Sequence, residues 1–204
     1  MKRHLAVLLI AALAIVLPVA LASAEEHEGR VIHGQYAFTG SNGILVAPFG
    51  FDANLIANAP PGHPEVGPVS QTSFQTWEGV YTFKPNGTGA FQAVFHDVNA
   101  SSSAGGSGHV GWAFRYTVKH GGKITFTLID GTYTGEWDTG PMAGTPADFT
   151  WTLPYYGAIS PDGNQIIITW GAPLILTSLV EPPIPGAYLQ LIPNGSFVLL
   201  RVDE

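Results

Sequence analysis

The most regular alternation of apolar and polar residues lies between Gly108 and Asp130. In its first run every second residue is large and apolar, namely Val110, Trp112, Phe114, Tyr116 and Val118. The residues between them are small or polar, a period of two that is typical of a strand with one buried face. The pattern resumes after a His-Gly-Gly sequence, so the stretch predicts two antiparallel strands joined by a tight turn.

Long and short connections alternate along the rest of the chain. The long ones are 40–72, 98–108, 138–147 and 180–186, and the short ones are 85–87, 120–122, 160–163 and 193–195. Two of the short ones read Pro-Asn-Gly, which favours tight turns and predicts a hairpin at each position. In an up-and-down meander all the long loops lie at one end of the sheet, which we call the mouth.

The composition indicates an all-β fold, because Gly, Pro, Thr and aromatic residues are plentiful and no stretch keeps helical periodicity over three turns. We predict an antiparallel up-and-down β-barrel of about 8–10 strands, since consecutive antiparallel strands that curl to hide their edges close into a barrel. A two-layer β-sandwich is the alternative, because spacing along the chain does not distinguish a closed sheet from two packed sheets.

The N-terminus has the pattern of a secretory signal peptide over residues 1–24. Lys2 and Arg3 precede an apolar run that ends in Ala-Ser-Ala, and Pro18 interrupts this run, which is short for a membrane anchor. We expect cleavage before Glu25, a flexible tail over 25–30, one domain over 31–204, and a secreted or periplasmic location. We expect this domain not to be embedded in a membrane; an outer-membrane barrel, which the length and loop pattern also suit, is the alternative.

Charge and cysteine content restrict the partners. The chain has eight Lys and Arg against fifteen Asp and Glu, and loss of Lys2 and Arg3 changes the formal charge from −7 to −9. An acidic protein of this kind is not expected to bind nucleic acid, whereas a small apolar or cationic molecule fits. There is no Cys, so the fold depends on its core and not on disulfides.

The acidic residues concentrate in the predicted long loops. They are Asp52, Glu65, Asp97, Asp138, Asp148 and Glu181. We expect no obligatory cofactor, but an acidic mouth would attract a divalent cation. His96, Asp97 and His109 flank one loop and are candidate metal ligands. Strand parity places both histidines on the polar face, which favours exposure to solvent.

Two carboxylates are candidate catalytic groups because their strand parity matches that of aromatic neighbours. Asp97 shares the parity of Phe95, and Asp130 shares that of Phe126. An inward carboxylate can serve as an acid or base. The alternative for Asp130 is that it caps a bulge at Gly131 through the backbone.

The aromatic residues of the strands are first of all a core, but they also define a candidate ligand site. Its members are Trp77, Tyr81, Phe95, Trp112, Tyr116 and Trp151. A cup lined by Trp and Tyr is a common apolar site, and Gly79, Gly111 and Ala93 among these large residues are expected to leave space.

Gly34-Gln35-Tyr36, on the first predicted strand, resembles the Gly-x-Trp opening of lipocalin-like (calycin) barrels, with Tyr in place of Trp. The chain is also similar to secreted bacterial β-proteins built from Gly-x-Tyr-x-Phe strands and Asn-Gly hairpins. The calycin resemblance implies a small apolar ligand inside the barrel.

We therefore predict a secreted barrel that binds a small ligand through an aromatic interior and an acidic, loop-rich mouth. One alternative is an enzyme of cyclase, isomerase or hydrolase type that uses an inward Asp; we favour a protein without enzymatic activity. The other is an extracellular structural or assembly subunit that self-associates through strand edges or Pro-rich loops.

Overall fold

The computed structural model describes residues 32–99, 104–170, 174–180 and 189–202. The predicted signal peptide, the tail over 25–30 and Glu181 lie outside the described residues. The strands are β1 (Gly34–Ala47), β2 (Gln71–Phe83), β3 (Thr88–Asn99), β4 (Ala104–Val118), β5 (Lys123–Leu128), β6 (Thr134–Trp137), β7 (Phe149–Thr150), β8 (Tyr155–Ile159), β9 (Gln165–Trp170), β10 (Leu176–Ser178) and β11 (Gln190–Arg201). Two short 3₁₀ turns, η1 (Pro64–Val66) and η2 (His120–Gly122), complete the described elements.

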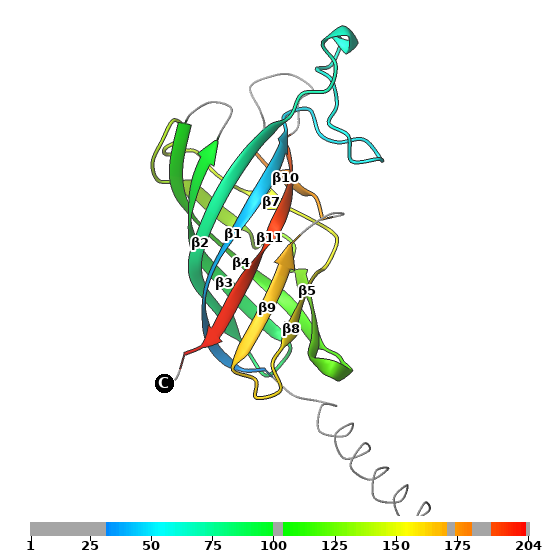
Figure 1. Ribbon diagram of the computed structural model, residues 1–204. Helices are drawn as coiled ribbons and strands as arrows, with labels where there is room; N and C mark the ends of the chain where they lie inside the picture. Colours follow the sequence, from blue (N-terminus) through cyan, green and yellow to red (C-terminus); the bar gives the residue numbers. More distant parts are fainter. Residues whose placement is uncertain (1–31, 100–103, 171–173, 181–188, 203–204) are drawn as a thin grey trace, which may run out of the picture.

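Eight of the strands form a closed, barrel-like ring (Figure 1). Their order is β1-β2-β3-β4-β5-β8-β9-β11, and β11 pairs with β1 to close it. Every neighbouring pair is antiparallel and the chain runs up and down. The predicted all-β barrel class is confirmed, and the sandwich alternative is wrong because a single sheet curls onto itself.

One side of the ring is continuous and the other is interrupted. Strands β1 to β4 and β11 each span 12 to 15 residues, whereas β5 to β10 span two to six. Both β5 and β6 pair with β4. They are two parts of one long strand, and the bend predicted at Gly131 lies between them. Similar breaks separate β7 from β8 and β9 from β10. The three breaks are neighbours, because Tyr133, Trp151 and Trp170, one from each, are in ring contact.

Three predicted connections are wrong. Of the predicted connection 98–108, residues 98–99 belong to β3 and residues 104–108 to β4. β1 continues to Ala47, so the long loop begins near residue 48 and not at 40. The second Pro-Asn-Gly, at 193–195, is not a turn but lies within β11, where Asn194 pairs with Gly43. Gly195 is present there because the backbones approach closely: a Cβ atom would lie 2.2 Å from the carbonyl oxygen of Ser41. Glycine is therefore needed at this position for close contact between strands and not for a turn.

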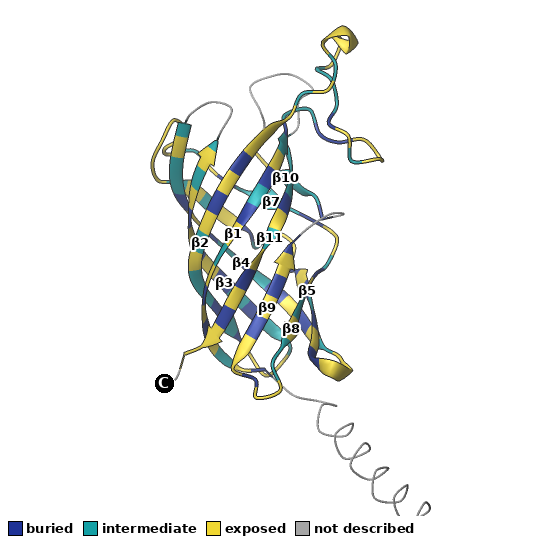
Figure 2. Ribbon diagram, in the orientation of Figure 1, coloured by how far each residue is buried: buried dark blue, intermediate teal, exposed yellow. Residues whose placement is uncertain are grey.

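Burial alternates along the strands as a closed sheet requires (Figure 2). The inward faces change character along the barrel axis. At the end that holds the short turns, the interior is filled by large side chains, among them Phe83, Phe114, Phe126 and Tyr155, which are in ring contact in pairs. Toward the mouth, the inward faces of β1, β2 and β3 include polar residues beside apolar ones, and the inward face of β4 becomes glycine. The barrel is therefore plugged at one end and open in its other half.

The loops that precede β9 lie at the ends of the barrel at which the sequence places them. The turns at 84–87, 119–122 and 160–164 lie at the plugged end, and the connections at 48–70 and 138–148 lie at the mouth. Figure 1 shows the β1–β2 connection, which carries η1, projecting away from the ring. This arrangement leaves the mouth bordered by the long loops.

Candidate functional site

Two adjoining cavities occupy the mouth half of the barrel. The inner cavity has a volume of about 80 Å³, and the mouth cavity has a volume of about 650 Å³. Both are lined by Ile44, Gln75, Trp137, Ala147, Phe149 and Leu191. The larger volume lies within the range of about 300–1,000 Å³ that is typical of small-molecule sites. The inner cavity is large enough for several waters or a small ring. Together they form a pocket that narrows toward the plug.

Aromatic rings from β4 and from the neighbouring, interrupted side of the sheet build one wall of the inner cavity. Trp112 on β4 stacks on Tyr133 with 5.4 Å between ring centroids, and Trp151 meets Trp112 edge-on at 5.3 Å. Trp170, the last residue of β9, contacts both Trp112 and Trp151. Tyr133 and Trp151 lie outside regular strands, so the breaks contribute two of these rings. Such edge-on and stacked pairs stabilise one another by about 0.5–1.5 kcal/mol each beyond burial.

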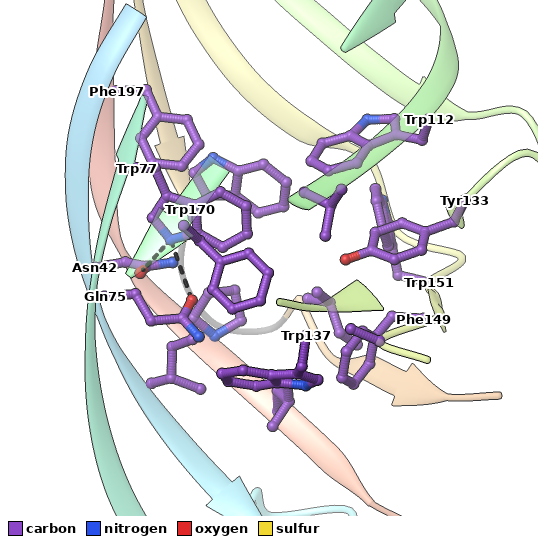
Figure 3. A pocket seen from close by; sticks show the side chains of 17 residues that line it. Asn42, Gln75, Trp77, Trp112, Tyr133, Trp137, Phe149, Trp151, Trp170 and Phe197 are labelled. Carbon is purple, nitrogen blue, oxygen red and sulfur yellow. Dashed lines mark hydrogen bonds between the residues drawn. The ribbon is translucent and has the colours of Figure 1, made fainter. Parts of the chain in front are cut away.

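A small polar patch interrupts the apolar lining on the opposite, continuous side (Figure 3). The indole Nε1 of Trp77 donates to Asn42 Oδ1 and to Gln75 Oε1, each at 3.1 Å. Asn42 and Gln75 are only 5% and 8% exposed, although both are polar. Buried amides are normally engaged in hydrogen bonds, and here their oxygens share one donor. The patch fixes a polar point in an otherwise apolar pocket.

Two other polar groups in the interior have no partner. Within the described part of the chain, no hydrogen-bond partner is present for the indole Nε1 atoms of Trp151 and Trp170. The Trp112 indole and the hydroxyls of Tyr81 and Tyr155 lie close enough together to influence the pKa of Tyr155. Burial raises the pKa of the Tyr155 phenol far above its ordinary value, and likewise the pKa of Tyr81. These phenols therefore stay neutral at physiological pH.

The predicted ligand residues divide between the two halves of the barrel. Trp77, Phe95, Trp112 and Trp151 line the inner cavity. Tyr81 and Tyr116 lie in the plugged half and line neither cavity. Tyr81 is fully buried between aromatic rings, and the Tyr116 hydroxyl donates to the carbonyl oxygens of Ile32 and Lys84 at 2.5 and 2.8 Å.

The glycines that were expected to leave space do not border the pocket. A Cβ atom on Gly79 would lie 2.1 Å from the carbonyl oxygen of Gln92 and 2.9 Å from a ring atom of Phe38. Gly79 therefore allows strands and rings to approach each other. The open volume arises nearer the mouth, where the inward face of β4 continues as Gly108 and Gly106.

The two candidate carboxylates lie in different environments. Asp97 lines the mouth cavity and accepts a hydrogen bond from the Ser73 hydroxyl, which is buried beside it. Asp130 is exposed at the bend after β5, where its Oδ1 accepts the Gly131 backbone N–H at 3.1 Å. Of the two, only Asp97 can meet a molecule in the pocket.

The candidate metal ligands are not brought together. His96 and His109 are exposed on the outer face, and His109 Nδ1 lies 2.8 Å from Asp138 Oδ1. Asp97 points the other way, into the mouth. Among the residues that the structure describes, no three His, Cys, Asp or Glu side chains are grouped closely enough to hold a metal ion.

Two carboxylates of the mouth loops, Asp148 and Asp52, accept hydrogen bonds from backbone groups. Asp148 Oδ1 accepts the Gly135 N–H at 2.8 Å, which ties the segment before β7 to β6. Asp52 Oδ1 accepts the N–H groups of Asn54 and Ile56, and the hydrogen bond from Ile56 is the main cause that lowers its pKa. These carboxylates order the loops individually.

The sequence did not point to several residues that line the pocket. Asn42 and Gln75 have the inward parity of Phe38 and Trp77, so parity would have found them once β1 was extended past residue 40. Tyr133, Trp137 and Phe149 come from a bend and from strands of four and two residues. Periodicity carries no signal over such short segments.

Comparison of the chain with protein-family models and with curated proteins finds no match to either. In the described segments, no helix has the length and apolar character needed to cross a membrane.

Proposed function

We propose that this protein binds a small, mainly apolar molecule in the pocket at the mouth of its barrel. The observation that carries the proposal is a cavity of about 650 Å³ that continues into an aromatic inner cavity of about 80 Å³. An apolar pocket with a few fixed polar groups is the usual form of a small-molecule site. The closed, barrel-like ring of eight strands agrees with this use of the interior.

The arrangement supports binding more than chemistry. Asp97 is the one carboxylate among the described residues that line either cavity, and its neighbour Ser73 donates to it. No histidine or lysine lines the pocket within the same part of the chain to form an acid–base pair with it. Asp97 is suited to orienting a polar group of a ligand at the mouth.

The proposal is tested by titrating the mature protein with N-phenyl-1-naphthylamine, a neutral apolar dye that fluoresces when it leaves water. We expect saturable binding, weakened at least tenfold by Leu191→Trp, because Leu191 is half-buried and lines both cavities. Leu200→Trp, on the exposed face of the same strand, is the matched control and should bind the dye normally. Circular dichroism checks that both variants fold. Absence of saturable binding to the native protein would overturn the proposal.

We also propose that the protein is exported. The support is the sequence alone: Lys2 and Arg3, the apolar run and Ala-Ser-Ala before Glu25. N-terminal sequencing of the protein recovered outside the cytoplasm should begin at Glu25. Recovery of the full-length chain in the cytoplasm alone would contradict export.

A further inference from the structure

The orientation of two buried amides decides which chemical groups the inner cavity can accept. The Trp77 N–H donates to the oxygens of both Asn42 and Gln75. If either amide were flipped, its NH₂ group would face another donor, so the network assigns the orientation. Both NH₂ groups are consequently left over. Neither has a hydrogen-bond acceptor within the described part of the chain, and Figure 3 shows the amides at the edge of the cavity.

A third donor faces this patch. Figure 3 shows Tyr133 on the opposite wall, with its hydroxyl directed into the cavity. The hydroxyl makes no hydrogen bond to any described residue, although Tyr133 is only 9% exposed. Burial raises the pKa of this phenol, so it keeps its proton and remains able to donate. The two walls therefore offer donors to whatever lies between them.

The rest of the lining excludes a charged group at this depth. No Lys, Arg, His, Asp or Glu is present among the described residues that line the inner cavity. A carboxylate would lose its hydration without gaining a counter-charge, which is strongly unfavourable. An ammonium group would meet N–H donors where it needs acceptors. A pure hydrocarbon would leave the amide donors unsatisfied, at about 1–3 kcal/mol for each buried group.

We propose that the inner cavity selects a neutral apolar molecule that carries a hydrogen-bond acceptor such as a carbonyl oxygen. The NH₂ groups of Asn42 and Gln75 receive this oxygen, and the Tyr133 hydroxyl lies opposite. The hydrocarbon part contacts Trp112, Trp151 and the other aromatic rings. This inference rests on the proposed function and adds the polarity of the ligand to it.

Four naphthalenes with one skeleton test the selectivity by competing with N-phenyl-1-naphthylamine. They are 2-acetylnaphthalene, 2-ethylnaphthalene, 2-naphthoate and 2-naphthylmethylammonium. We expect the ketone to bind about tenfold more tightly than the hydrocarbon, the equivalent of one to two net hydrogen bonds, and both ions to bind more weakly than the ketone.

Gln75→Met keeps the volume of the side chain and removes its donor, while Trp77 still has the Asn42 oxygen. The preference for the ketone over the hydrocarbon should fall to within about threefold, with hydrocarbon affinity kept. Gln92→Met, on the exposed face of β3, is the matched control and should keep the full preference. Tyr133→Phe is the second variant, in case Gln75→Met does not fold, and should also reduce the preference.

The outcomes separate the two proposals. If the dye binds but the hydrocarbon, the carboxylate or the ammonium compound equals or exceeds the ketone, the polarity inference is wrong and the binding function stands. The polarity inference is also wrong if the preference survives both Gln75→Met and Tyr133→Phe. If neither the dye nor any naphthalene binds, the binding function itself fails.

Discussion

The pairing of β11 with β1 closes the ring, and two adjacent substitutions in Pro193-Asn194-Gly195 test it. Gly195 has no positive φ, and a Cβ atom there would lie 2.2 Å from Ser41 O and 2.6 Å from Asn42 Cβ. Because backbone must move to admit a methyl group, Gly195→Ala should lower the free energy of unfolding by about 1–3 kcal/mol. For a chain of this size the melting temperature falls by about 2–4 °C per kcal/mol.

Asn194→Thr distinguishes a strand from a turn at this position. In the structure Asn194 is exposed on β11, where a β-branched residue is favourable, so stability should change by no more than about 0.5 kcal/mol. In a Pro-Asn-Gly turn the same change would force a β-branched residue to a positive φ and cost about 1–3 kcal/mol. Gly43→Ala is the control for Gly195→Ala, because nothing lies within 4 Å of its Cβ position.

Urea unfolding followed by tryptophan fluorescence gives the three stability changes. The expected result is a large loss for Gly195→Ala and little change for Asn194→Thr and Gly43→Ala. If Asn194→Thr were strongly destabilising while Gly195→Ala behaved like Gly43→Ala, β11 would not run through this sequence, and the ring would not close as described.

Three further outcomes are expected. Tyr116→Phe removes a hydroxyl that donates to two backbone carbonyls, so the free energy of unfolding, measured by urea titration, should fall by about 1–2 kcal/mol. An unchanged free energy of unfolding would mean that water fully replaces the lost hydroxyl as donor. Because burial raises the pKa of Tyr133 and Tyr155 above the unfolded value, their contribution to stability is complete below about pH 10 and is lost as the pH rises further. Tyrosinate absorbance at 295 nm should therefore rise together with unfolding by circular dichroism, and early titration of all tyrosines in the folded state would refute this. Asp130→Ala should alter stability by less than about 1 kcal/mol and leave dye binding unchanged, since the carboxylate only caps the Gly131 N–H; a tenfold loss of binding would place it in the site.

The strands were predictable where one face is uniformly apolar over many residues. The run from Val110 to Tyr116 shows this, and the structure buries each of its apolar positions. The full length of β1, fourteen residues, was not predictable, because its inward face passes from Tyr36 and Phe38 to Gly40 and Asn42. A period-two pattern disappears when the buried face itself becomes small or polar.

The prediction of a turn at 193–195 is wrong for a related reason. Asn-Gly favours tight turns through positive φ, yet glycine also allows close backbone contact. The flanking residues do not distinguish these uses. Only the position of Gly195 beside Asn42 in the closed ring shows which one applies.

Part of the pocket was accessible from sequence and part was not. Trp77 and Trp112 follow from parity on long strands, and both line the inner cavity. Strand parity does not indicate at what depth the aromatic plug ends, so Tyr81 and Tyr116 were grouped with them. The opposite wall depends on which short segments close the interrupted side, a property of pairings distant in sequence, such as that of Thr177 on β10 with Thr150 on β7.

The division of the ring into a continuous and an interrupted side bears on how such a protein can change. Strands β1 to β4 and β11 hold the register of the whole sheet through long ladders of paired residues. The bends near Tyr133, Trp151 and Trp170 supply much of the aromatic wall without long ladders of their own. The lining of the pocket can therefore drift, or be redesigned, by exchanging side chains on these short segments while the remaining framework keeps its alignment.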